Sequence, residues 1–88
     1  LVNTARGELV DEAALAAALI GKRLAGAASD VFVDEPPGKD HPLLELDNFI
    51  AMPHSAGQTR EGLSAMGRVT ADNALRMLRG EPPLFRVA

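Results

Sequence analysis

No cysteine occurs among the 88 residues of this chain. Without cysteine there is no disulfide framework and no thiolate metal site, so we predict no metal centre and take a reducing compartment, the cytoplasm, as the expected location. The chain also lacks a run of about 18 apolar residues and a basic stretch followed by an apolar one. We therefore expect neither a membrane span nor a signal peptide within these residues.

Clustered positive charge is missing as well. Nine Lys and Arg residues stand against 12 Asp and Glu, and the formal net charge is -3 at pH 7. Nucleic acids and anionic membranes attract basic patches, so neither is an expected partner. The chain has no initiating methionine and opens at Leu1 inside an apolar run. At this length we expect one domain or less, cut from a longer polypeptide.

Three short apolar runs have the character of buried strands, at residues 1–7, 24–32 and 49–52. The first two are separated by a stretch with the composition of a helix. A strand, a helix and a strand within about 30 residues form a βαβ unit, whose crossover is right-handed in nearly all proteins. The sequence therefore predicts an α/β fold with a parallel sheet.

Two helices are predicted from capping residues and apolar periodicity. Asp11 is a suitable N-cap for an Ala- and Leu-rich segment that Gly21 ends. Thr59 can cap a second helix of about 20 residues, which ends near Gly80 and has apolar residues every three or four positions. The apolar stripes are Leu15, Ala18 and Leu19 in the first helix and Leu63, Met66, Thr70, Ala74 and Met77 in the second.

The segment between the second and third strands, residues 33–48, is rich in proline and charge. Only residues 43–46 have the composition of a short helical turn. A connection of this length without regular structure is uncommon in compact domains, so we interpret it as a functional loop. After the second helix, residues 84–88 are predicted to form an extended tail.

Polar side chains follow each predicted strand. Arg6 follows the first strand, Asp30 and Glu35 the second, and His54 the third. Ligands of open parallel sheets bind outside the carboxyl ends of the strands, so these groups are expected to meet around one pocket. A carboxylate bonded to one imidazole nitrogen fixes the tautomer of a general acid or base, a role suited to Glu35 and His54. The planar fork of Arg6 suits a substrate carboxylate.

Each of these residues also has a purely structural interpretation. Arg6 is then a surface cation, Asp30 caps a turn and Glu35 is solvated. His54 is then a turn residue bonded to the backbone. His41, beside Pro42, is interpreted as a loop residue. Because three separate strand ends carry complementary groups, we favour a functional site.

Short motifs are spread along the chain at specific spacings. They are Asn3-Thr4-Ala5-Arg6-Gly7, Val10-Asp11-Glu12, Ala14-Leu15, Gly26-Ala27, Asp30-Val31-Phe32, Glu35-Pro36, Pro42-Leu43, Asn48, Pro53-His54 and Thr59-Arg60-Glu61. There are 24 positions from Arg6 to Asp30, five more to Glu35 and 19 more to His54. In these motifs nearly the whole chain resembles the C-terminal part of the D-isomer-specific 2-hydroxyacid dehydrogenases.

The resemblance implies an α/β fold that is the C-terminal portion of a Rossmann-type parallel sheet. Three short strands with a crossover helix would be followed by a long C-terminal helix. Residues 1–57 would form the C-terminal half of the NAD(P)-binding domain. Residues 58–88 would be a long helix and tail that return to the substrate domain.

The resemblance also implies roles for individual residues. Arg6 would bind the substrate carboxylate and carbonyl, His54 would be the acid and base, and Glu35 would be its partner. The cofactor would be NAD or NADP, the substrate a small 2-hydroxy or 2-oxo acid, and the intact protein a homodimer. The residues implied in cofactor binding are Thr4, Ala5, Arg6, Asp30, His54, Ser55, Ala56 and Gly57.

Two departures from the family pattern bear on these expectations. Ser29 stands where the family has a large aliphatic residue, which is expected to weaken the second strand. No Gly-x-Gly-x-x-Gly loop is present, so the isolated 88-residue piece is expected to be inactive. Alternatives are a metabolite-sensing or co-regulator member of the same fold and a self-associating structural fragment. A hydrolase using the Glu35–His54 pair would lack a nucleophile, because Ser55 adjoins His54 in the chain and sequence neighbours seldom reach each other as nucleophile and base.

Overall fold

The computed structural model describes residues 1–87 and forms two compact units, Leu1–Ala56 and Gly57–Ala88. The first unit contains the strands, the short helix α1 (Glu12–Ile20) and the residues predicted to do chemistry. The second contains the long helix α2 (Arg60–Leu78) and the segment after it. Their assignment to a cofactor-binding and a substrate domain, divided after residue 57, stays a prediction.

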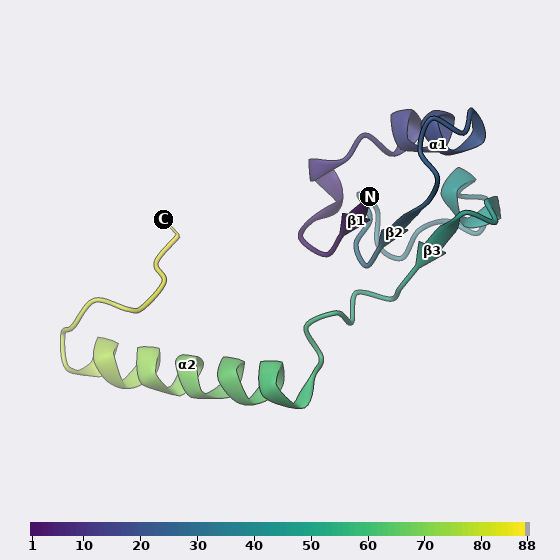
Figure 1. Ribbon diagram of the computed structural model, residues 1–88. Coiled ribbons are helices and arrows are strands. Elements are labelled where there is room, and N and C mark those ends of the chain that lie inside the picture. The colour runs from purple at the N-terminus through teal and green to yellow at the C-terminus, as the bar shows by residue number, and fades with distance from the viewer. Residues whose placement is uncertain (88) are drawn as a thin grey trace. The chain divides into compact units, whose positions relative to one another are not determined.

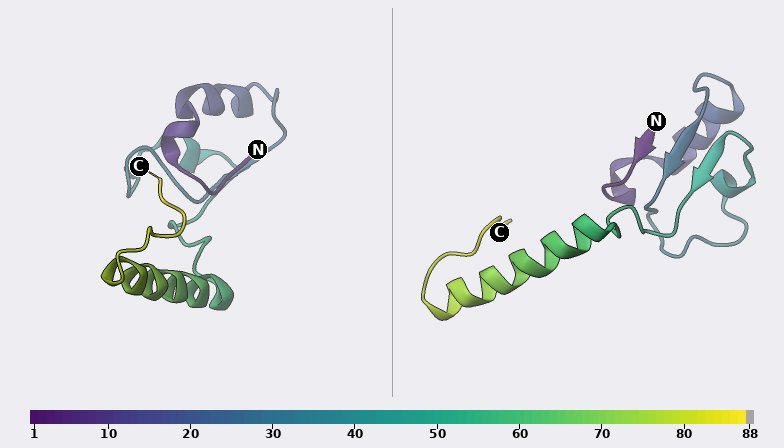
Figure 2. Two further views of the ribbon diagram at one scale, coloured as in Figure 1. Left: turned by 90° about the vertical axis from the view of Figure 1, so that its left-hand side faces the viewer. Right: turned by 60° about the horizontal axis from the view of Figure 1, so that its bottom comes forward.

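The first unit is built on a three-stranded parallel sheet, which confirms the predicted fold. Strands β1 (Val2–Asn3), β2 (Ala27–Ser29) and β3 (Phe49–Ala51) lie side by side in the order β1-β2-β3 (Figures 1 and 2). In the register of the sheet, Ala28 is paired with Val2 on one side and with Ile50 on the other. Successive strands therefore lie next to each other, and their carboxyl ends share one edge.

The strands are shorter than the apolar runs that predicted them, because polar side chains turn the chain early. After β1, Asn3 Oδ1 accepts a hydrogen bond from the amide of Ala5 at 3.1 Å and closes a turn. After β2, the buried Ser29 Oγ donates to the carbonyl of Val31 at 2.7 Å. The predicted strand at 24–32 is thereby reduced to three residues.

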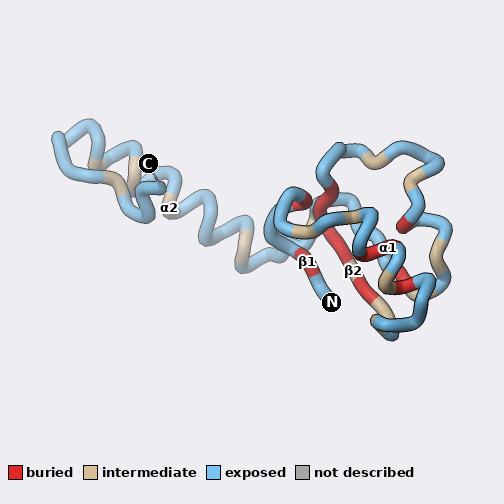
Figure 3. The backbone as a smooth tube through the Cα atoms, turned by 90° about the horizontal axis from the view of Figure 1, so that it is seen from above, coloured by how far each residue is buried: buried red, intermediate tan, exposed pale blue. Residues whose placement is uncertain are grey.

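Helix α1 (Glu12–Ile20) begins and ends where the sequence predicts. Asp11 Oδ1 accepts from the amide of Ala14 at 2.9 Å, and Gly21 is the C-cap. The buried stripe contains Ala16, whereas the predicted member Ala18 is only half buried. The core cluster formed with the sheet and the loop consists of Leu15, Ala16, Leu19, Ala27, Phe32, Leu43 and Phe49. Figure 3 shows buried positions in red on α1 and along β2, with others on β1 and in the loops.

Two short 3₁₀ segments interrupt the connections. Segment η1 (Gly7–Leu9) follows β1, and η2 (Pro42–Glu45) lies in the long loop. The helical turn predicted at 43–46 therefore exists but starts one residue earlier, because Pro42 suits the first position of a helix. Leu43 is only 1% exposed and anchors this loop in the core.

The second unit contains helix α2 (Arg60–Leu78), 19 residues long, capped by Thr59 as predicted. The Thr59 hydroxyl oxygen accepts from the amide of Gly62 at 2.9 Å. The helix ends at Leu78, and Gly80 follows with φ of 74°, a conformation that favours glycine. None of the residues of α2 is buried. None of the helices in residues 1–87 is both long enough and apolar enough to cross a membrane.

The segment after α2 corrects one prediction. Leu84 and Phe85 form a turn instead of an extended tail, because Asn73 of α2 binds the backbone of Leu84 through both ends of its amide, at 2.6 and 3.3 Å. Arg76 Nε donates to the carbonyl of Pro82 at 2.8 Å. The last residue of the predicted tail, 88, lies outside the described residues.

Candidate active site

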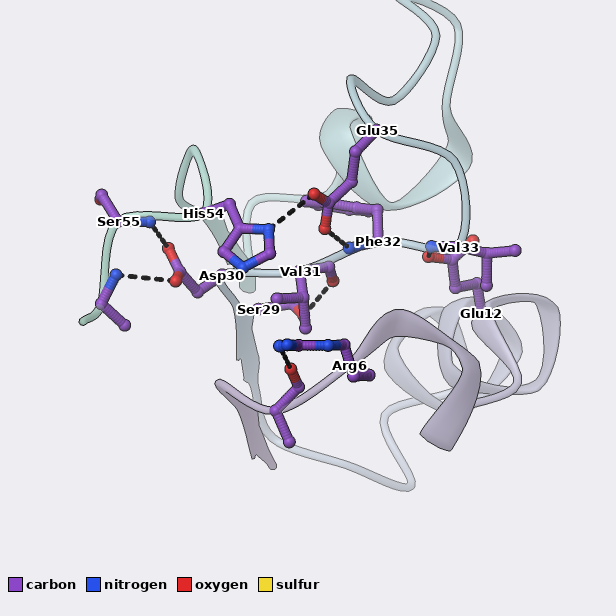
Figure 4. A network of polar contacts seen from close by, with 12 residues as sticks. Arg6, Glu12, Ser29, Asp30, Val31, Phe32, Val33, Glu35, His54 and Ser55 are labelled. Atoms are coloured by element: carbon purple, nitrogen blue, oxygen red, sulfur yellow. Dashed lines mark hydrogen bonds and ion pairs between the residues drawn. The ribbon is translucent and has the colours of Figure 1, made fainter. Parts of the chain in front are cut away.

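The predicted site residues lie at the carboxyl ends of the three strands. Arg6 follows β1, Asp30 follows β2 and His54 follows β3, and Glu35 lies on the loop that begins after β2. Since the strands are parallel, these ends meet at one edge of the sheet. Figure 4 shows the side chains of the four residues at this edge, with the His54 ring directed toward Glu35.

Glu35 and His54 form a bonded pair. His54 Nδ1 lies 2.6 Å from Glu35 Oε2, and Glu35 Oε1 accepts from the amide of Phe32 at 2.9 Å. An ionised carboxylate only accepts hydrogen bonds, so Nδ1 carries a hydrogen and Nε2 is left for a ligand. The side chains are half exposed, at 50% for His54 and 36% for Glu35, which leaves the pair accessible from solvent.

The surroundings of Glu35 favour its charged form. The hydrogen bond from His54 lowers the pKa of this carboxyl below its ordinary value, and the Phe32 amide and the charges of His54 and Arg6 add to the effect. These contributions outweigh the opposing effect of burial. Glu35 is thus a carboxylate poised to hold a protonated imidazole, and Arg6 is near enough for its charge to act on the same group.

Asp30 holds the backbone that follows His54. Its two carboxylate oxygens accept from the amides of Ser55 at 2.8 Å and Ala56 at 2.7 Å. Burial of Asp30, which is 5% exposed, raises its pKa, but the bonds from Ala56 and Ser55 and the charge of His54 lower it further, so the net shift is downward. His54 has φ of 54°, in the left-handed region that a non-glycine residue rarely adopts. Asp30 therefore holds the chain immediately beyond a strained residue.

Arg6 is placed by Asn3, which is not among the predicted site residues. The Asn3 side chain donates to the carbonyl of Arg6 at 2.9 Å and accepts from the amide of Ala5. Arg6 Nη1 donates to the carbonyl of Ala5 at 2.6 Å. A guanidinium has five N–H donors, and the exposed Arg6 side chain has further donors to offer a carboxylate. An Asn at a strand end before a turn is the sequence signal that identifies Asn3 as the positioning group.

A cavity of about 520 Å³ opens beside the Glu35–His54 pair. Asp30, Glu35 and His54 form its polar part, and the apolar remainder comes from the loop and the end of β3. This volume lies within the range of small-molecule sites, about 300–1,000 Å³. The apolar lining consists of Phe32, Pro36, Pro37, Ala51, Met52 and Pro53.

The other residues predicted to contact the cofactor follow β1 and β3. Thr4 and Ala5 lie in the turn after β1, and Gly57 begins the second unit. The amides of Ser55 and Ala56 are already bonded to Asp30, so a ligand would meet their carbonyls or side chains. Within residues 1–87, no three His, Cys, Asp or Glu side chains are grouped closely enough to hold a metal ion.

The fold is a parallel α/β sheet with a crossover helix, and polar groups gather at its carboxyl edge. Proteins of this class bind ligands at the ends of the strands. The chain belongs to the D-isomer specific 2-hydroxyacid dehydrogenase family, because the family model described as its NAD binding domain matches residues 1–56. This assignment confirms the resemblance predicted from the motifs.

Several relatives support the assignment. A D-3-phosphoglycerate dehydrogenase of Archaeoglobus fulgidus is 46% identical over 93% of this chain. A glyoxylate reductase of Korarchaeum cryptofilum is 46% identical over 94% of it. The chain spans 16% and 25% of the lengths of these two relatives. A D-isomer specific 2-hydroxyacid dehydrogenase from Xanthobacter autotrophicus Py2, solved with NADPH and MES, matches 99% of this chain and 35% of its own, at 39% identity and a TM-score of 0.82.

Proposed function

We propose that the protein containing this chain is an NAD(P)-dependent D-2-hydroxyacid dehydrogenase. The observation that supports this most is the bonded Glu35–His54 pair at the carboxyl edge of the sheet, with the charge of Arg6 acting on it. The carboxyl edge of the sheet thus carries His54 as a candidate acid-base group, Glu35 as its carboxylate partner and Arg6 as a cation for an anionic substrate. Such a set suits the interconversion of a 2-oxo acid and a 2-hydroxy acid.

The roles follow from the donor and acceptor groups. Arg6 binds the substrate carboxylate and polarises the adjacent carbonyl. In the reducing direction, His54 Nε2 donates its proton to the carbonyl oxygen, and in the oxidising direction it takes the hydroxyl proton. Glu35 stabilises the protonated ring and keeps the reacting nitrogen in place. NADH or NADPH, when bound, would supply the hydride to the substrate C2 in the reducing direction, and NAD or NADP would accept it in the oxidising direction.

The residues at this edge fit the nicotinamide end of such a cofactor. A carboxylate offers about four lone-pair sites, and Asp30 uses one on each oxygen for the backbone, which leaves acceptors for the N–H groups of a carboxamide. Thr4, Ala5 and Arg6 after β1 and Ser55 to Gly57 after β3 would contribute backbone groups and complete this end of the site. The chain has no glycine-rich phosphate loop of its own, so the pyrophosphate would be bound by other parts of the protein.

The proposal is tested with the full-length protein. Oxidation of NADH and NADPH is followed with glyoxylate, hydroxypyruvate, pyruvate and 3-phosphohydroxypyruvate, which vary the side chain while keeping the 2-oxo acid. We expect turnover with at least one acid and transfer of deuterium from C4-labelled cofactor to C2 of a D-configured product, where C2 is chiral. Cofactor binding without turnover on any small 2-oxo acid would contradict the proposal and favour a sensing or co-regulator role.

We also propose that the full-length protein is a homodimer in the cytoplasm. Apolar side chains of α2 such as Leu63 and Met66 are about half exposed in this unit, a surface that a second copy or the rest of the protein would cover. A chain without cysteine suits a reducing compartment. Sedimentation velocity gives the oligomeric state, and cell fractionation gives the location.

A further inference from the structure

Two consecutive backbone amides of the loop after β2 are held by two different carboxylates. Glu35 Oε1 accepts from the amide of Phe32 at 2.9 Å, and Glu12 Oε1 accepts from the amide of Val33 at 3.0 Å. Figure 4 shows Glu12 reaching Val33 from the α1 side and Glu35 reaching Phe32 from the loop. The Phe32–Val33 segment is therefore fixed from α1 as well as from the catalytic pair.

Glu12 is itself held by a second imidazole. Its other oxygen, Oε2, lies 3.1 Å from His41 Nε2, and His41 Nδ1 accepts from the amide of Leu43 at 3.3 Å. A neutral ring that accepts at Nδ1 carries its hydrogen on Nε2, so His41 donates to Glu12. The ring of Phe32 meets His41 edge-on, with centroids 5.4 Å apart. His41 thus fixes the carboxylate of Glu12 and contacts the segment that Glu12 holds.

The segment that carries Arg6 rests on the same peptide group. A Cβ placed on Gly7 would lie 2.1 Å from the carbonyl carbon of Phe32 and 2.3 Å from the nitrogen of Val33. The Gly7 backbone is therefore in close contact with the Phe32–Val33 peptide. Arg6 immediately precedes Gly7, so this peptide is the point at which the arginine segment and the Glu35 loop meet.

We propose that Glu12, supported by His41, is a positioning residue of the site: by holding the Val33 amide it fixes the peptide that sets Arg6 relative to the Glu35–His54 pair. This inference rests on the proposed dehydrogenase function. Glu12 also lies in the first turn of α1, where a negative charge stabilises the helix. That effect depends on charge alone, whereas positioning depends on an acceptor at Oε1, and the two are separable.

The test compares three variants of the full-length enzyme. Glu12→Ala removes the acceptor and the charge, Glu12→Gln keeps an amide oxygen for Val33, and Asp11→Ala removes the N-cap of α1 without touching the loop. We expect kcat/KM to fall roughly tenfold to a hundredfold in Glu12→Ala, as displacements of about 1 Å do in catalytic sites. Glu12→Gln should recover part of this loss, because its oxygen still accepts from Val33 while its NH2 group faces the donor Nε2 of His41. Asp11→Ala should keep the wild-type value while unfolding at lower denaturant. A wild-type kcat/KM in Glu12→Ala, or a loss in Asp11→Ala as large as that in Glu12→Ala, would overturn the proposal.

A second readout is independent of turnover. Amide hydrogen exchange at Phe32 and Val33 should accelerate in Glu12→Ala, and the pKa of Glu35, measured by carbon NMR of its carboxyl group, should rise toward the ordinary value. Wild-type exchange and an unchanged Glu35 titration would overturn the positioning role. If the wild-type enzyme shows no dehydrogenase turnover while these readouts respond as expected, the proposed function fails and the structural linkage stands.

His41→Phe provides a variant in case Glu12→Ala does not fold. It keeps a ring beside Phe32 and removes both nitrogen contacts. We expect a smaller change in the same direction in kcat/KM, in Val33 exchange and in the Glu35 titration. A fully wild-type response in all three would contradict the supporting role of His41.

Discussion

His54 is restrained on two sides. Its ring is bonded to Glu35 at 2.6 Å, and the two amides that follow it are bonded to Asp30. Its backbone has φ of 54°, a conformation that persists in a non-glycine residue only where the surroundings impose it. The three residues therefore form one unit in which two buried or partly buried carboxylates fix an imidazole.

The same two carboxylates predict how stability depends on pH. The pKa values of Asp30 and Glu35 are lowered below their ordinary values of 3.8 and 4.5, so in acid the unfolded chain binds more protons than the folded one. Their contribution to the free energy of unfolding is therefore fully present above about pH 5 and is lost as the pH falls through the folded-state values. Urea unfolding between pH 7 and pH 2 measures this loss.

Asp30→Asn should make the acid side of that profile shallower, because one titrating group is removed and an amide cannot accept from both backbone donors. Asp34→Asn, an exposed acid in the same loop, is the control and should keep the wild-type profile. Identical acid profiles for wild type and Asp30→Asn would show that the anchor contributes nothing to folding.

Arg6→Lys tests whether the planar guanidinium of Arg6 binds the substrate carboxylate. A lysine keeps the charge but cannot bind a carboxylate with two parallel bonds. Losing one charge-assisted bond of about 1.5–3 kcal/mol should lower kcat/KM of the full-length enzyme roughly tenfold to a hundredfold, with KM raised and kcat reduced together. Arg23→Lys, an exposed arginine after α1, is the matched control. Unchanged steady-state kinetics in Arg6→Lys would remove the carboxylate-binding role.

At the scale of elements, the site depends on a close approach between η1 and the loop after β2. Gly7→Ala places a methyl group 2.1 Å from the Phe32 carbonyl carbon, so the two segments must separate. We expect a loss of about 1–3 kcal/mol in the free energy of unfolding, as for other overpacked sites, together with a lower kcat/KM. Gly38→Ala is the control, because nothing lies within 4 Å of its Cβ position. A Gly7→Ala protein as stable and active as wild type would contradict this contact.

The elements were predictable from the sequence where local chemistry decides them. Asp11 and Thr59 cap α1 and α2 as their sequence positions indicate, because the capping bond spans only three residues. The ends of the strands were not predictable from the sequence, since Asn3 and Ser29 turn the chain through side-chain hydrogen bonds that compete with the sheet. The stripe on α1 was predicted with Ala18 in place of Ala16, because small residues on both sides of the helix blur the periodicity.

The site was predictable from the sequence only as far as the order of the strands determines it. The parallel order of the strands follows from the βαβ pattern, and it places Arg6, Asp30 and His54 at one edge. The bond between Asp30 and the amides after His54, and the Glu12–His41 pair, join residues 25 to 29 positions apart. Such bonds depend on how the loops fold against the sheet, and no local pattern encodes them.

At the scale of the whole molecule, the buried core lies in the unit that holds the site. Leu19 is 1% exposed within this core, whereas Leu78 of α2 is 85% exposed. In the 88-residue chain, Leu19→Ala should lower the free energy of unfolding by about 2–5 kcal/mol, and Leu78→Ala should change it by less than about 0.5 kcal/mol. Denaturant unfolding checks both values. Similar losses in the two variants would mean that the core extends beyond the first unit.

The central claim is that His54 exchanges the proton while Arg6 and Glu35 hold the substrate and the ring. The most direct test is the steady-state kinetics of His54→Gln in the full-length protein with its best 2-oxo acid and NADH or NADPH. Loss of a general acid predicts a fall in kcat of about 10²–10⁴-fold with KM changed only a few-fold. A His54→Gln enzyme that turns over at the wild-type rate would contradict the account.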